Sequence, residues 1–219
     1  FFLLIRLPPF STLFPYTTLF RSRVKKQFEY TMSIPCVKEA MKFIQDDERN
    51  TIEEQKELVL IEAPTREEEK RAAVMMEKFK ALGLENVHID RGGNVVGLRR
   101  GSGKGPKVLI EGHLDTVFPF GTVHGVEERD GFLYAPGIGD DTRALAMLLG
   151  LLRALNQNEI KTFGDIVFVA TTREEGMGGL GGMKDFLNDN DDIDISLTIN
   201  NRSEEHTSEL QSLTSLVCR

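Results

Sequence analysis

The stretch Val108–Val117 (VLIEGHLDTV) constrains the fold of this chain more than any other. Its apolar start predicts a buried strand, and His113 and Asp115 follow at the strand's end. Because side chains alternate along an extended backbone, these two residues lie on the same side. An imidazole and a carboxylate in this arrangement are typical of a metal ligand and the group that orients it. A core strand with a solvated tail has the same pattern, so the rest of the sequence must decide.

The composition favours a soluble globular protein and argues against some functions. The 219 residues are enough for one sizeable domain, and 40% hydrophobic and 28% charged residues are ordinary proportions. The net charge of -7 argues against nucleic acid as the main partner, because phosphate binding needs a basic surface. Cys36 and Cys218 have no metal-type spacing and predict no disulfide framework, which favours a reducing, cytoplasmic compartment.

The two ends of the chain differ from its body. Residues 1–22 are apolar but interrupted by prolines, so they fit neither a secretory signal nor a membrane span. The segments LFPYTTLFRS (13–22) and RSEEHTSELQS (202–212) resemble translated sequencing-library adapters, and both meet the body at an Arg-Ser pair. We therefore expect residues 1–22 and 202–219 to be non-native, and residues 23–201 to be part of a domain that originally continued further.

The body alternates helical and extended patterns. Two hairpins are expected, one around Gly92-Gly93-Asn94 and one at Asp130-Gly131. The alternation predicts an α/β fold in three layers, α/β/α, with a mixed central sheet. The expected strands are 87–90, 95–99, 108–117, 165–171 and 193–199. The expected helices are a pair within 37–61 divided by the polar run 45–50, one capped by Thr65 and ending at Leu82, one after GIGDD (137–141) ending at Leu155, and one at 182–187.

Acidic and imidazole side chains gather at the predicted carboxyl ends of strands, where the sites of open α/β sheets lie. Clustered carboxylates repel one another unless cations neutralise them, and imidazole together with carboxylates suits zinc. Two metals about 3.5–4 Å apart need a bridging carboxylate, which one aspartate can supply. The residues concerned are His113 with Asp115, Asp140 with Asp141, Glu174 with Glu175, and Asn200.

Each pair also has a simpler interpretation. Glu174 and Glu175 could be a solvated pair at a strand end, and the two aspartates at 140–141 could serve only to cap a helix. We expect Asp141 to cap the helix or to face solvent, and Asp140 to bind metal.

Three ordered motifs carry a family resemblance: GHLDTV (112–117), GIGDDTRALA (137–146) and TREEGMGG (172–179). They are similar to the zinc exopeptidase family of peptidase T, bacterial glutamate carboxypeptidase, aminoacylase and acetylornithine deacetylase. GGNVVG (92–97) and EAPTREEEKRA (62–72) fit the same family. The resemblance implies that residues 23–201 are a partial catalytic domain, truncated before a smaller dimerisation domain.

The resemblance also implies a role for each site residue. His113 binds one zinc ion, Asp140 bridges two, and Glu175 binds the other. Asp115 holds His113 in the correct tautomer, as groups behind a metal ligand do. Glu174 is the general base that takes a proton from the metal-bridging water. The implied cofactors are two Zn²⁺ ions, with Co²⁺ or Mn²⁺ as substitutes, and no residue is assigned to an organic cofactor.

The sequence departs from the family at its carboxyl end. The family has an aspartate ligand where Asn200 stands, and a neutral amide is a weaker ligand. The dimerisation domain and a late metal-binding histidine lie beyond residue 201 in the family. We therefore expect the parent protein to be a homodimeric zinc metallopeptidase, and this chain by itself to be inactive.

Three further interpretations stay open. The GIGDDTR motif (137–143) favours a small-peptide exopeptidase, and an N-acyl amino acid deacylase of the same family is the second choice. A catalytically inert fragment is the alternative from another class. GMGGLG (176–181) also fits the GxGxxG pattern of a dinucleotide-binding module, but Glu174 and Glu175 would repel a pyrophosphate there.

Overall fold

The computed structural model of the protein describes residues 2–5 and 18–199, with side chains from residue 24 onward. The helices are α1 (Thr18–Ser33), α2 (Pro35–Asp46), α3 (Glu48–Leu60), α4 (Glu69–Ala81), α5 (Thr142–Gln157) and α6 (Gly181–Asp189), with a 3₁₀ turn at Gly176–Gly178. The strands are β1 (Phe2–Ile5), β2 (Glu85–Ile89), β3 (Val95–Arg99), β4 (Val108–His113), β5 (Glu127–Arg129), β6 (Phe132–Tyr134), β7 (Ile166–Thr171) and β8 (Ile195–Thr198).

Six strands form one mixed sheet in the order β1-β8-β4-β7-β3-β2. β4 lies parallel to both β7 and β8, whereas β3 pairs antiparallel with β7 and β2 antiparallel with β3. β1, from the end segment 1–22, adds an antiparallel edge strand beside β8. In the register of β4 and β7, His113 lies opposite Thr171, so both strands end at the same edge of the sheet.

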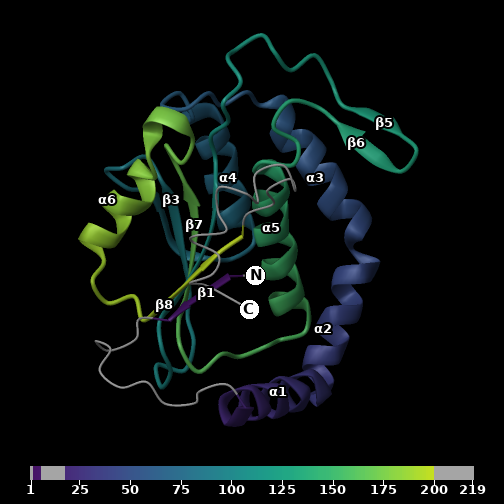
Figure 1. The fold of residues 1–219 in the computed structure, drawn as a ribbon, viewed down its shortest axis with the longest axis vertical. Helices are drawn as coiled ribbons and strands as arrows, with labels where there is room; N and C mark the ends of the chain where they lie inside the picture. Colours follow the sequence, from purple (N-terminus) through teal and green to yellow (C-terminus); the bar gives the residue numbers. More distant parts are fainter. Residues whose placement is uncertain (1, 6–17, 200–219) are drawn as a thin grey trace.

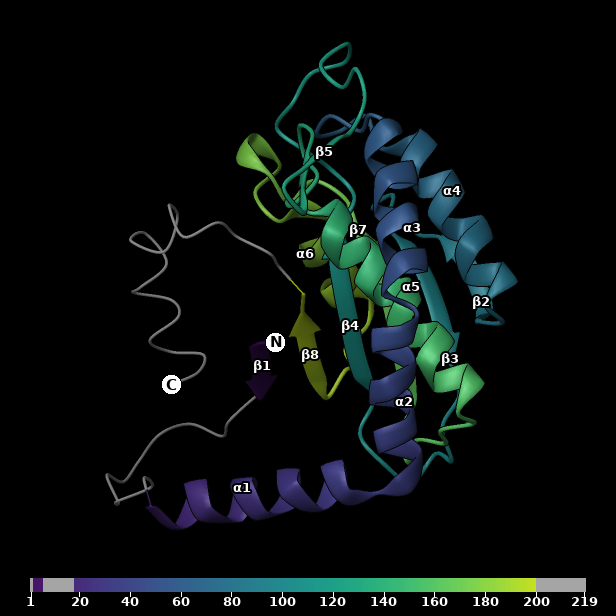
Figure 2. The same ribbon diagram turned by 90° about the vertical axis from the view of Figure 1, so that its right-hand side faces the viewer.

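Helices cover both faces of this sheet, which confirms the three-layer prediction (Figures 1 and 2). On one face, α4 and α5 pack over the strands, and α2 and α3 lie outside α5. Leu145, Leu148 and Leu149 of α5 share this core with Ile110 and Phe168 of the sheet. On the other face, α6 packs through Phe186. β4 and β7 are therefore buried on both sides, and their ends are held rigidly.

Several local expectations are confirmed, with shifted ends. The hairpin of β2 and β3 and the small hairpin of β5 and β6 both form, and Gly83 follows α4 with a left-handed φ of 80°. The break between α2 and α3 is confined to Asp47, because residues 45–46 and 48–50 are helical. Among the described residues, no helix has both the length and the apolar character needed to cross a membrane.

The start of α4 was predicted wrongly. Thr65 does not cap this helix, which begins at Glu69. Pro64 instead forms a parallel bridge with Thr116, and the Thr65 N–H donates to the Thr116 carbonyl. This pairing ties residues 64–65 to the continuation of β4. The Thr65 hydroxyl is thereby free to donate to the Asp115 carboxylate at 2.9 Å.

Candidate metal centre

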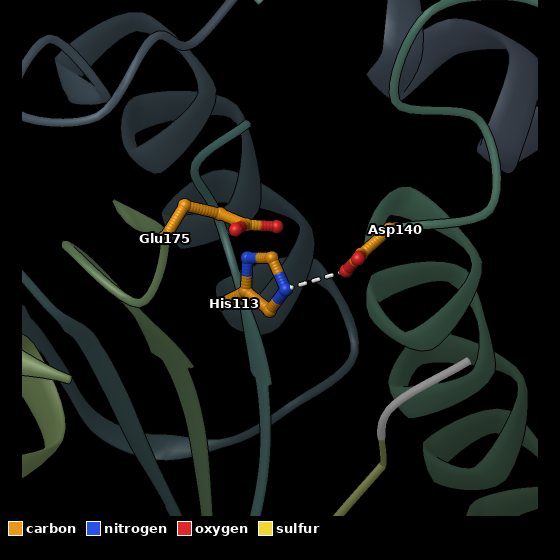
Figure 3. A group of neighbouring side chains, drawn as sticks. All are labelled: His113, Asp140 and Glu175. Atoms are coloured by element: carbon orange, nitrogen blue, oxygen red, sulfur yellow. Dashed lines mark hydrogen bonds and ion pairs between the residues drawn. The ribbon is translucent and has the colours of Figure 1, made fainter. Parts of the chain in front are cut away.

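Three of the predicted ligands meet at the sheet edge where β4 and β7 end. His113 is the last residue of β4, Asp140 precedes α5, and Glu175 follows β7. One nitrogen or oxygen atom from each lies within 4.8 Å of the others, and His113 Nε2 is 2.9 Å from Asp140 Oδ1. In Figure 3, Asp140 and Glu175 extend toward the His113 ring from opposite sides. This is a group of the size and chemistry that holds a metal ion.

The orientation of His113 is set by the residue two positions later. His113 is buried, and its Nδ1 lies 3.0 Å from the Asp115 main-chain carbonyl and 3.5 Å from Asp115 Oδ1. An N–H at Nδ1 can donate to the carbonyl, which leaves Nε2 as the lone-pair atom that faces Asp140. Glu174 lies on the same side, with Oε2 3.9 Å from Nε2. The ring therefore presents Nε2 to the acidic cluster.

The carboxylate of Asp115 contacts the segment that carries the two glutamates. It is fully buried and accepts the Glu174 N–H at 2.9 Å through Oδ1 and the Glu175 N–H at 3.0 Å through Oδ2. These bonds, together with the neighbouring His113, outweigh burial and lower the Asp115 pKa. Asp115 therefore contacts both His113 and the backbone of the two glutamates.

The pKa values of the site reveal an excess of negative charge. Burial lowers the pKa of His113, but the carboxylates of Asp115 and Asp140 outweigh it and raise the pKa to about 11. Burial, followed by the charges of Asp140 and Glu174, raises the pKa of Glu175 to about 6. Both shifts reflect a surplus of negative charge, which a proton on one of these groups would offset. A bound cation would do the same, so the donor set fits a metal ion.

Asp141 differs from both sequence expectations. It occupies the N-cap position of α5, but its side chain makes no capping bond, and it is buried and does not face solvent. Its Oδ2 accepts the His113 N–H at 3.0 Å and lies over Gly112, where an added Cβ would approach it to 3.3 Å. Oδ1 has no hydrogen-bond partner, and burial raises the Asp141 pKa well above its usual range. Packing of α5 against β4 therefore draws this side chain inward.

Asn200, the weaker predicted ligand, lies outside the described residues. Glu68, Arg71 and Asn94 contact backbone groups beside the site, each from far away in the chain. Their motifs, EAPTREEEKRA and GGNVVG, carry the resemblance, but nothing in the sequence indicated these contacts.

The Gly-rich turn after β7 serves the packing of the chain itself. A Cβ at Gly178 would come within 2.5 Å of the Arg173 carbonyl oxygen, and one at Gly182 would overlap the backbone of Thr172. These glycines are thus needed for close backbone contacts. The GxGxxG pattern therefore needs no dinucleotide-binding role to explain it.

A three-layer α/β/α fold with histidine and carboxylates gathered at the strand ends is the architecture of a candidate metal site at the edge of an open sheet. Residues 109–211 match the family described as Peptidase family M20/M25/M40. The three motifs that carry the resemblance, at 112–117, 137–146 and 172–179, all lie within this match, which supports the resemblance to this family.

Individual proteins agree with this resemblance. A putative LysW-lysine/LysW-ornithine hydrolase of Pyrococcus abyssi is 35% identical over 121 residues, which cover 55% of this chain and 32% of that protein. Carboxypeptidase G2 of Pseudomonas sp. is 30% identical, over 65% of this chain and 36% of that protein. A tripeptidase structure from Staphylococcus aureus is 28% identical with a TM-score of 0.58, over 71% of this chain and 44% of that one. The chain thus spans about a third of the length of these curated relatives.

Proposed function

We propose that this chain is part of a dinuclear zinc exopeptidase that cleaves small peptides. The observation that supports this most is the cluster of His113, Asp140 and Glu175, with ligand atoms within 4.8 Å of one another at the ends of β4 and β7. The match to a peptidase family and the likeness to a tripeptidase structure support a peptide substrate.

The residues divide into ligands and groups that act on the reactants. We assign His113 to one zinc ion, Glu175 to the other, and Asp140 to both. Zinc held there would lower the pKa of a water molecule and polarise the scissile carbonyl. Co²⁺ or Mn²⁺ could take its place, since the same nitrogen and oxygen donors suit these ions.

Glu174 is our candidate for the general base. Its carboxylate lies 3.9 Å from His113 Nε2 and so borders the place where the ligand atoms converge. There it would take a proton from the attacking water and return it to the leaving amine. Asp115 is a positioning residue in this scheme, because it contacts His113 and the N–H groups of Glu174 and Glu175.

We also propose that the active enzyme is longer than this chain. Because the chain spans 44% of the tripeptidase, we propose that turnover needs the remaining parts, including a homodimer interface, and that the chain alone is inactive. Residues 23–201 are the native part in this proposal, and residues 1–22 and 202–219 are not. Cys36 is a free thiol, in keeping with a cytoplasmic location.

A second candidate is hydrolysis of an N-acyl amino acid. The name of the Pyrococcus relative, a putative LysW-lysine/LysW-ornithine hydrolase, favours it, because that name places a single amino acid, lysine or ornithine, on one side of the bond that is hydrolysed. The two reactions share an amide bond, a zinc site and a base, and they differ in the group that flanks the bond.

Zinc titration calorimetry of the chain with two adjacent substitutions tests the site. Glu175→Gln removes a proposed ligand and is expected to weaken zinc binding by more than about tenfold. Losing a residue that only orients a ligand already weakens metal binding by about tenfold or more. Glu174→Gln removes the proposed base and is expected to leave zinc affinity nearly unchanged. Absence of zinc binding, or equal weakening by both substitutions, would contradict the assignment.

A further inference from the structure

Four consecutive backbone N–H groups that lead into the site all donate to side chains from distant parts of the chain. The segment Thr172–Glu175 directly follows β7 and carries both glutamates of the site. All four N–H groups lie beyond the last residue pair of β4 and β7, His113 and Thr171, and each donates to a side-chain oxygen. The bonds are Thr172 to Asn94 Oδ1 at 2.9 Å, Arg173 to Glu68 Oε1 at 3.0 Å, Glu174 to Asp115 Oδ1 at 2.9 Å, and Glu175 to Asp115 Oδ2 at 3.0 Å.

Glu68 holds two unusual backbone positions with one oxygen. Its side chain is buried at the start of α4, and Oε1 also accepts the Arg66 N–H at 2.8 Å. Arg66 and Arg173 have φ angles of 77° and 55°, in the left-handed region that non-glycine residues rarely adopt. Such positions persist only where surrounding contacts hold them, and they cluster at functional sites.

The same helix face reaches the other half of the site. Arg71 lies three residues after Glu68, so the two side chains share one face of the α4 start. Its NH1 group donates to the Leu114 carbonyl at 2.6 Å, between His113 and Asp115. α4 therefore contacts the carboxyl ends of both β4 and β7.

We infer that Glu68 is a positioning residue of the metal site. By accepting the Arg173 N–H, it fixes the turn after β7 so that the next two side chains, Glu174 and Glu175, point toward His113. Asn94 holds the residue before this turn, and Asp115 holds the two residues after it. The inference rests on the proposed role of Glu175 as a metal ligand.

The test measures amide hydrogen exchange and zinc affinity in the full chain. In Glu68→Ala, we expect faster exchange of the Arg173–Glu175 amides without metal, and zinc binding weakened about tenfold, at the lower end of the effect of groups behind a ligand. Glu68→Gln should behave like the wild type, because its amide oxygen still accepts both bonds. Glu67→Ala, one residue away and exposed, is the matched control and should also change neither quantity.

Several results would overturn the inference. One is exchange and zinc affinity in Glu68→Ala equal to those in Glu67→Ala; another is Glu68→Gln impaired as much as Glu68→Ala, which would indicate a role of the charge. If Glu68→Ala does not fold, Glu68→Asp takes its place, because it keeps the charge but withdraws the carboxylate by one methylene. Faster exchange of the Arg173–Glu175 amides and weaker zinc binding are then expected of Glu68→Asp. A wild-type chain that binds no zinc would contradict the proposed function, and exchange would still decide whether Glu68 holds the turn.

Discussion

Replacing Arg71 with methionine is expected to destabilise the protein severely. Arg71 is 1% exposed, and its guanidinium donates to the carbonyls of Ile61 and Leu114 at 2.8 and 2.6 Å. Burial lowers its pKa to about 10, while the negative charge of Asp115 opposes that shift, so the group is charged at neutral pH. Methionine fills a similar volume but can donate to neither carbonyl.

The magnitude follows from what the substitution leaves unpaired. Each buried carbonyl that loses its donor costs about 1–3 kcal/mol. Asp115 also loses the attraction of a nearby positive charge, which adds to this cost. These costs overlap, and the added apolar burial offsets about 1 kcal/mol. We therefore expect Arg71→Met to lower the free energy of unfolding by about 4 kcal/mol, a large share of the roughly 5–15 kcal/mol of an ordinary domain.

Urea unfolding followed by far-ultraviolet circular dichroism measures this difference. Arg71→Lys keeps the charge but can donate well to only one carbonyl, so its loss should be roughly half as large. Arg49→Met, at an exposed position of α3, is the control and should stay within about 0.5 kcal/mol of the wild type. A loss below about 1 kcal/mol in Arg71→Met would refute the reasoning, because two buried carbonyls would then have found other donors.

Three further predictions concern the fold around the site. Leu149→Ala opens a cavity in the core between α5 and the sheet and should cost about 2–5 kcal/mol in the same unfolding measurement; under 1 kcal/mol would contradict the packing described. Gly182→Ala would bring its methyl group against the Thr172 carbonyl, so α6 should shift and the melting temperature should fall. An unchanged melting temperature would contradict this close contact. Glu62 accepts the N–H groups of residues 121–123, which lowers its pKa; because the folded pKa is the lower one, this stabilisation is present above the unfolded pKa and lost as pH falls through the folded value. A nuclear magnetic resonance titration that finds the Glu62 pKa at or above its usual value would refute that contact.

The elements that carry the site were predictable because their signals are local. The all-apolar run of β7 requires burial on both faces, and the alternation in β4 puts His113 at the strand's end on the side of the site. Parallel strands end at one edge, so the meeting of His113 with Asp140 and Glu175 follows from the order of elements.

The errors arose where contacts between distant residues override local rules. Thr65 has the residue type of a helix cap, but its hydroxyl bonds to Asp115, 50 positions away. Asp141 has the position of a cap, but packing of α5 on β4 turns it toward the His113 N–H. Glu68 bonds to the backbone of a residue 105 positions later, and nothing in the local pattern distinguishes it from the exposed glutamates on either side.

The most direct test of the account is X-ray absorption at the zinc edge of the zinc-loaded chain. We expect only nitrogen and oxygen scatterers at about 2.0–2.2 Å, with the outer-sphere pattern of one imidazole that disappears in His113→Ala. A sulfur scatterer at about 2.3 Å would mean that a cysteine binds the ion. That result, or an imidazole pattern that survives His113→Ala, would contradict a metal centre at the ends of β4 and β7.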